Sequence, residues 1–363
     1  ETLWELAQLN LVAGREERWA AALRKAARRP PDDLHARVTL AANLSMIGDH
    51  EALGKLADDT ASKNSEPTDL PAIRLLSILD GLAGRLDRDV ARWTRHLDRD
   101  PESLQAAFGL STALYRAGDT ERLRRLADQV DRKFEGKSVP EQSMIAQIDA
   151  SAGNWARAAK GYARYAGMVN RPSESSYSRG LLFLALMEAG EREEAARVRA
   201  ELTRLLGRPD APDDELRSPV MSLMLLPADD PEMLLRAASR AFKLDTKVDR
   251  VHSARVHGTV LYRAGRYEEA IALLQEHVTT PPLYGRAGGS SESWAILAMA
   301  HDRLDRPDEA EPWLAKFRAA CQKPSEWSSD VQRRMLLAEA EAVHREALAR
   351  AKAPSPPTGS PRP

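Results

Sequence analysis

The residue types that most often do chemistry are present in this sequence, but not at the spacings that chemistry requires. Its eight histidines form no His-Glu-x-x-His motif, and the nearest pair, His252 and His257, is five residues apart. Two metal ligands on one helical face need a spacing of three or four. The one cysteine, Cys321, excludes an intrachain disulfide and a zinc site built from cysteines. We therefore expect no metal or other cofactor, and histidines that are exposed or cap helices.

Adjacent glutamates, which acid–base catalysis could use, occur at 16–17, 193–194 and 268–269. Each pair follows a glycine and begins an expected helix, where the helix dipole stabilises negative charge without any catalytic role. The Gly-rich stretch 285–291 could bind an anion, but it follows two prolines rather than a strand, and we interpret it as a flexible junction. No nucleophile elbow, P-loop or dinucleotide-binding motif is present. The sequence therefore indicates a protein that is not an enzyme.

The elements that would position a functional residue repeat along the chain. The string Leu-Tyr-Arg-Ala-Gly at 114–118 recurs unchanged at 261–265. Glycines recur at intervals of 34 to 37 residues, except for one interval that is about twice as long. A turn near Asp229 divides this long interval, and Asp305 occupies the next turn after the last glycine, so the series gives nine units. The glycines are Gly14, Gly48, Gly84, Gly118, Gly153, Gly190 and Gly265. A period near 34 residues is typical of a solenoid of helix pairs.

Local signals explain why each unit is a helix pair. In the eighth unit, Val256 and Val260 recur at helical spacing, and Gly265 can adopt the left-handed conformation that ends a helix. Pro281 then ends the second helix, because proline cannot continue its hydrogen bonds. The same reasoning places helix pairs at about 1–29, 34–63, 70–100, 102–134, 139–170, 176–207, 217–245, 249–279 and 291–322.

The eighth unit resembles the tetratricopeptide repeat (TPR). The positions that carry this resemblance are Gly258, Leu261, Gly265, Tyr267, Ala270, Leu274 and Pro282. The ninth unit is similar, with Asp305 in place of the turn glycine, whereas earlier units match loosely: Asp89, for example, stands where a small residue is expected. The resemblance implies an all-α fold, a right-handed α-solenoid of about nine TPR-like helix-turn-helix repeats. The last two units also resemble C-terminal TPR regions of large bacterial multidomain proteins.

Three domains follow from this pattern. Residues 1–323 form the TPR-like superhelical repeat domain, and residues 324–352 form a C-terminal capping helix. A cap is expected because the end of a solenoid must present a polar face to water. Residues 353–363 are rich in proline, and we expect a disordered tail.

The resemblance also indicates where a partner would bind, because the first helix of each TPR lines the concave groove. The register set by the turn glycines places ten candidate partner-binding residues there: Arg74, Gln105, Phe108, Tyr115, Arg116, His252, Arg255, Tyr262, Arg263 and Arg303. The recurring string places a Tyr–Arg pair in the groove twice, and both residue types are frequent in binding hot spots. Alternatively, the tyrosines pack between neighbouring repeats and the arginines pair with acidic neighbours.

Composition narrows the class of partner. With 53 Lys and Arg against 54 Asp and Glu, the chain lacks the cationic surplus on which bulk nucleic-acid affinity depends. It has no uncharged apolar run long enough to span a membrane and no visible signal peptide, so we expect a cytoplasmic protein. We expect a non-catalytic scaffold that binds a protein or peptide in its groove. The alternative is a regulatory or substrate-recruiting segment of a larger bacterial signalling protein, a kinase or WD40 fusion, whose partner is an upstream domain of the same polypeptide.

Overall fold

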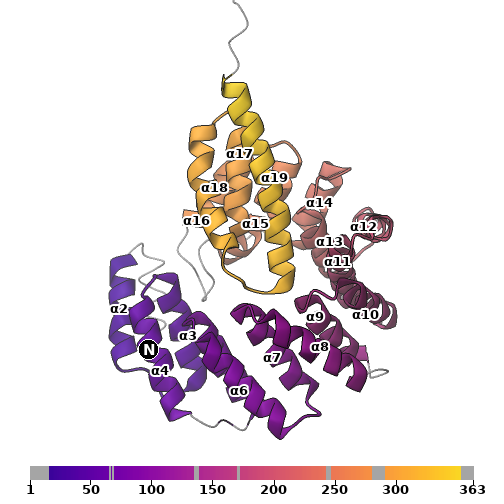
Figure 1. Ribbon diagram of the computed structural model, residues 1–363. Helices are drawn as coiled ribbons and strands as arrows, with labels where there is room; N and C mark the ends of the chain where they lie inside the picture. Colours follow the sequence, from indigo (N-terminus) through magenta and orange to yellow (C-terminus); the bar gives the residue numbers. More distant parts are fainter. Residues whose placement is uncertain are drawn as a thin grey trace, which may run out of the picture.

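The structure is a computed structural model that describes residues 16–64, 67, 69–134, 139–169, 172–242, 247–279 and 291–352. All regular elements in these ranges are α-helices (Figure 1). They are α2 (Glu16–Arg28), α3 (Leu34–Met46), α4 (His50–Lys63), α5 (Leu70–Leu82), α6 (Leu86–Arg99), α7 (Leu104–Ala117), α8 (Thr120–Phe134), α9 (Val139–Ser151), α10 (Trp155–Met168), α11 (Pro172–Ala189), α12 (Arg192–Leu206), α13 (Asp213–Leu223), α14 (Pro231–Ala241), α15 (Lys247–Arg263), α16 (Tyr267–Thr279), α17 (Ser291–Arg303), α18 (Pro307–Cys321) and α19 (Trp327–Lys352).

Consecutive helices from α3–α4 to α17–α18 form hairpins that follow the predicted helix pairs closely. The largest difference at the start of a pair is four residues, at α11 and α13. Carboxylates in the first turn of α13 explain its earlier start, because they stabilise the helix N-terminus. First helices contact one another in the series α3, α5, α7 and α9, and again in the pairs α11–α13 and α15–α17. This stacking of hairpins confirms the prediction of an all-α solenoid.

The turns inside the hairpins carry the repeat. Each of the six predicted turn glycines in the described residues, from Gly48 to Gly265, has a positive φ between 69° and 80°. Asp305 takes the same conformation, with φ 56°, and is the one non-glycine residue in the described part of the chain to do so. The seventh unit differs: α13 and α14 are joined by residues 224–230, where the described residues include no left-handed turn.

Small residues allow the two helices of a hairpin, or neighbouring hairpins, to approach closely. A Cβ atom at Gly109 would lie 2.5 Å from the Trp93 ring, and one at Gly258 would overlap the fully buried Leu274 side chain. Packing at this density explains why the TPR-like pattern asks for a small residue there. Asp89, at a position expected to be small, is completely buried.

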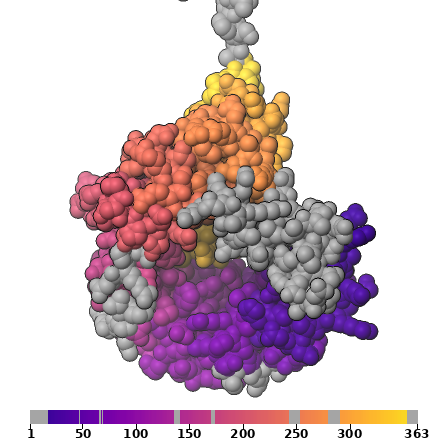
Figure 2. All heavy atoms as spheres, turned by 180° about the vertical axis from the view of Figure 1, so that it is seen from behind, coloured from indigo at the N-terminus to yellow at the C-terminus, as the bar shows by residue number. Residues whose placement is uncertain are grey.

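The last helix, α19, packs on α17 and α18, and its N-terminal end also reaches α11 (Figure 1). There the buried Trp327 lies 5.8 Å from Trp155 and 5.9 Å from Tyr162, measured between ring centroids. The two aromatic residues belong to α10, so the chain turns back onto its middle units. Seen from behind, the C-terminal helices form the upper body and the N-terminal helices the lower body (Figure 2).

Several predictions fall outside the described residues: the first helix of the pair at 1–29, the junction 285–290 and the tail 353–363. The boundaries of the three predicted domains stay a prediction. Within the described residues, no helix is long and apolar enough to span a membrane.

Candidate binding surface

All ten predicted groove residues lie on the first helices of the hairpins, in α5, α7, α15 and α17, and α19 lies against the same side. We call this side the inner face: the surface of α7, α11, α15 and α17 that faces α19. Tyr115 of α7 donates a hydrogen bond of 2.8 Å from its hydroxyl to Oδ2 of Asp330. Arg116 donates from Nε to the Ser325 carbonyl at 3.4 Å. Burial and the Asp330 carboxylate both raise the pKa of Tyr115, so the hydroxyl stays protonated and can donate this hydrogen bond.

Arg263 of α15 makes the most extensive contact on the inner face. Its buried guanidinium binds both carboxylate oxygens of Glu339 in α19, with 2.8 Å between Nη2 and Oε2. The same group donates to the carbonyl oxygens of Met224 at 3.1 Å and Leu225 at 2.8 Å. Because a two-pronged arginine–carboxylate pair fixes both distance and orientation, Arg263 joins the end of α13, α15 and α19 into one unit.

Tyr262, the partner of Arg263 in the repeated string, is buried between the eighth and ninth units. Its ring centroid is 5.6 Å from that of Tyr267, and its hydroxyl is 3.6 Å from the Met299 sulfur. Burial, reinforced by the Glu339 carboxylate, raises the pKa of Tyr262 to about 12. This is the packing arrangement that the sequence left open as an alternative to groove contact.

Three further predicted residues, Arg74, Gln105 and Arg303, are exposed. Arg303 pairs with Glu346 of α19 at 3.2 Å. Nη2 of Arg74 donates a hydrogen bond of 3.4 Å to Oε1 of Gln105. Phe108 is half-buried and lines a small cavity of about 250 Å³ beside the start of α19. His252 falls in α15, but its side chain is outside the described residues. Partner binding by these residues stays a prediction.

The expectation that the histidines are exposed or cap helices is wrong for His257, His301 and His344, which are buried. Nδ1 of His344 lies 3.0 Å from Asp302 and its Nε2 lies 3.2 Å from Glu311, so it joins α19 to α17 and α18. The signal was present, since His344 belongs to the apolar stripe that α19 buries. Across the described ranges, no cluster of histidine, cysteine and carboxylate residues has the makings of a metal site.

Sequence reasoning missed the α19 side of this surface. Glu339 and Glu346 are seven residues apart on one face of a helix and hold two predicted groove arginines, Arg263 and Arg303. A third contact runs the other way, from Arg334 of α19 to Glu188 of α11 at 2.8 Å. The seven-residue spacing was visible in the sequence, but nothing local indicated which helix it faces.

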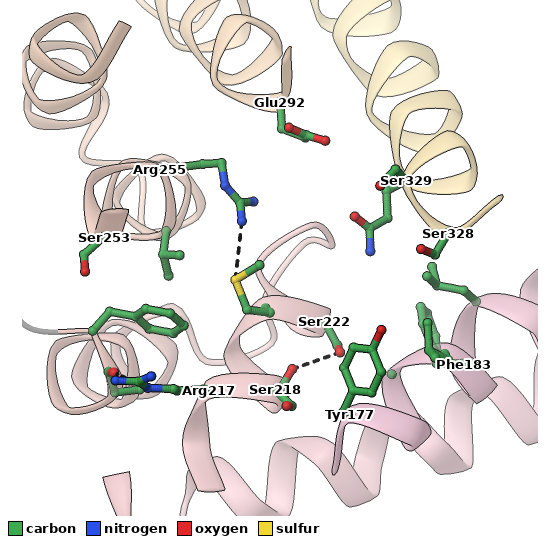
Figure 3. Close-up of a pocket in the computed structure, with 18 of the residues that line it drawn as sticks. Tyr177, Phe183, Arg217, Ser218, Ser222, Ser253, Arg255, Glu292, Ser328 and Ser329 are labelled. Carbon is green, nitrogen blue, oxygen red and sulfur yellow. Dashed lines mark hydrogen bonds between the residues drawn. The ribbon is translucent and has the colours of Figure 1, made fainter. Parts of the chain in front are cut away.

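A cavity of about 1170 Å³ opens on the inner face beside the N-terminal end of α19 (Figure 3). At this point α15 packs on α14 more than on α13. The first helices of the seventh and eighth units, α13 and α15, therefore do not stack closely. Of the predicted groove residues, Arg255 lines it. Its Nη2 is 3.6 Å from the Met221 sulfur, and burial lowers the pKa of Arg255 against the opposing influence of Glu292.

The period, the left-handed turn residues and the close approach at Gly258 together decide the kind of repeat. The chain folds as a tetratricopeptide-like solenoid. No family model matches it, and no curated protein shows significant sequence similarity to it.

Among solved structures, three are similar to this chain. A chain of the APC/C hetero-tetramer Cut9–Hcn1 matches at 15% identity and TM-score 0.43, over 89% of this chain and 59% of that one. Yeast Tom70 matches at 14% identity and TM-score 0.35, over 96% and 90% of the two chains. The P58(IPK) TPR domain matches at 16% identity and TM-score 0.27, over 95% and 98%. These likenesses are distant, so the fold assignment depends on the repeat geometry.

Proposed function

We propose that this protein is a non-catalytic scaffold that binds a protein or peptide segment along its inner face. The observation that supports the proposal is the position of α19. The inner face already holds this charged 26-residue helix through side chains of α7, α11, α15 and α17. A surface that can bind one helix by charge-assisted hydrogen bonds has the chemistry to bind another.

The contacts with α19 indicate how a partner segment would be held. Tyr115, Arg263 and Arg303 present a hydroxyl and two guanidinium groups toward α19, and each meets a carboxylate. Such contacts give orientation as well as affinity, because arginine binds a carboxylate at two points. A partner segment either displaces α19 from these side chains or binds beside it, where the inner face is open.

A selection experiment tests the proposal. Random peptides displayed on phage are selected on the full chain, and amide hydrogen exchange is measured with and without the best peptide. We expect slower exchange in the first helices α7, α11, α15 and α17. Protection confined to second helices such as α8, α12 and α16, or failure to select any peptide, would contradict the proposal.

Two exposed arginines supply a matched control for the same experiment. Arg74 is on the first helix α5, and Arg197 is on the second helix α12, where it pairs with Glu194 of its own helix at 2.8 Å. We expect Arg74→Gln to weaken a peptide that crosses α5, and Arg197→Gln to have no effect.

The alternative function is that of a regulatory or substrate-recruiting segment of a larger bacterial signalling protein. With this function, the inner face binds a different partner. In that case an upstream domain of the same polypeptide binds there. Sequencing of the gene upstream of Glu1 tests the alternative, since a kinase or WD40 module would support it. The cytoplasmic location and the absence of nucleic acid among the partners are part of both proposals.

A further inference from the structure

We propose that the cavity beside α19 accommodates one acidic side chain of a bound peptide segment, with Arg255 as its counter-charge. The inference rests on the proposed function and names the chemistry of the partner. Figure 3 shows Arg255 of α15 with Glu292 above it and Ser328 and Ser329 of α19 on the far side, and the dashed line from Arg255 marks its contact with the Met221 sulfur of α13.

The first observation is that no ion pair joins Arg255 to a carboxylate among the side chains that the structure describes, although Glu292 influences it electrostatically. Within the described residues its guanidinium makes one hydrogen bond, to the Met221 thioether at 3.6 Å, and a thioether is a weak acceptor. The neighbouring arginines of the inner face differ, since Arg263 binds Glu339 and Arg303 binds Glu346. A half-buried guanidinium that is not hydrogen-bonded to a carboxylate is costly, and a carboxylate supplied by a ligand would offset that cost.

The second observation is the size and lining of the cavity. Its volume of about 1170 Å³ exceeds the roughly 300–1,000 Å³ of typical small-molecule sites, so it has room for several peptide residues. Phe183 and Phe242 supply apolar surface, while Ser222 and Tyr177 supply hydroxyl groups. This mixture suits a peptide that has apolar and polar side chains around its one charged residue.

The third observation limits how acidic the peptide can be. Carboxylates also line the cavity, at Asp213, Asp214, Glu292 and Glu326, and of these Asp213 is already paired with Arg240 at 3.2 Å. A uniformly acidic segment would be repelled by the others. Two further arginines line the cavity, but Arg240 pairs with Asp213 and Arg217 donates to the Ala241 carbonyl. The lining therefore favours a single acidic residue at Arg255, with neutral or basic residues on either side of it.

Peptides selected on the full-length wild-type chain provide the probe. We expect one position to be enriched in Asp or Glu. Replacing that residue by its amide should weaken binding to the wild-type chain about tenfold or more, and Arg255→Met should weaken the parent peptide by a similar factor. In the combination of amide peptide and Arg255→Met chain, the two effects should not add, because both changes remove the same contact.

Arg197→Met is the matched control, and selection on Arg255→Glu should enrich Lys or Arg at the same position. Selected peptides without an acidic position, or equal affinity of the Arg255→Met and Arg197→Met chains, would overturn the inference and leave the proposed function standing. If no peptide is selected at all, the proposed function fails as well. The amide peptide tests the contact on the unaltered protein, whatever the stability of the Arg255 variants.

Discussion

Arg263 of α15 and Glu339 of α19 are 76 residues apart in the sequence and form a two-pronged ion pair on the inner face of the solenoid. The Arg263 side chain is 4% exposed and the Glu339 side chain 27% exposed. The pair connects the eighth repeat to the last helix, and with it the string Leu-Tyr-Arg-Ala-Gly acquires a structural role. Its arginine holds α19 in unit eight, and the first copy of the string contacts α19 through Tyr115 and Arg116 in unit four.

Replacing Glu339 should therefore destabilise the protein more than replacing Glu346 seven residues later. Glu339→Gln leaves a buried guanidinium without its carboxylate, although two backbone carbonyls still accept from it, and we expect a loss of about 2 kcal/mol in the free energy of unfolding. Glu346 and Arg303 are 58% and 36% exposed, so Glu346→Gln should cost less than about 1 kcal/mol. Urea unfolding of both variants measures the difference, and equal losses would contradict it.

The hydrogen bond from Tyr115 to Asp330 should fix the N-terminal end of α19. Tyr115→Phe removes the donor and keeps the ring, and the expected cost is about 1 kcal/mol. Hydrogen exchange should become faster in the first turns of α19 and stay unchanged near Arg350 at its other end. Unchanged exchange at both ends would show that this hydrogen bond does not hold the helix.

Burial of Asp89 should make stability depend on pH. Burial raises the pKa of Asp89 from 3.8 to about 6, so the folded protein binds this proton more tightly than the unfolded chain. The stability that the proton provides is present below about pH 4 and is lost as the pH rises through 6. Asp89→Asn should exceed the wild type in stability by on the order of 1–3 kcal/mol at pH 8 and match it at pH 4.

Asp87, exposed on the same helix, provides the control for that comparison. Thermal or urea unfolding at the two pH values should show no pH-dependent difference between Asp87→Asn and the wild type. A constant difference between Asp89→Asn and the wild type at both pH values would exclude titration of Asp89 as the cause.

The left-handed turn at Asp305 should tolerate asparagine but not alanine. Asparagine adopts a positive φ at little cost, whereas alanine has no side-chain hydrogen bond to compensate for it. We expect Asp305→Ala to lose about 1 kcal/mol of stability and Asp305→Asn to lose less. Both variants lose the carboxylate of the exposed ion pair with Arg350, and asparagine keeps an oxygen that can accept from it, so the difference between them reports mainly the turn conformation. Equal melting temperatures would contradict this account.

The sequence predicts the repeats well because their determinants are local. A turn glycine, or Asp305 in its place, needs only its own neighbours to adopt a positive φ, and helical periodicity extends over one element. Asp89 is an exception to the repeat pattern, which expects a small residue at this position. In the structure its carboxylate is buried there.

The binding surface is less predictable because it depends on distant pairs. The register of the repeat assigned Tyr115, Arg263 and Arg303 to the groove. In the structure their partners are on α19, 43 to 215 residues away in the sequence. The cavity at Arg255 lies where α15 packs on α14 and does not stack closely on α13. No period or motif encodes that packing.

The central claim is that the inner face binds a helix and that α19 occupies it. A fluorescent peptide of residues 327–352, titrated against the full chain, tests this most directly, with a scrambled peptide as control. In the wild type the covalently attached α19 competes with the peptide at a high effective concentration. The Asp330→Asn/Glu339→Gln double variant weakens this competitor, so the wild type should bind the peptide at least about tenfold more weakly than the double variant. Equal binding to the two proteins, or binding to neither, would contradict the claim.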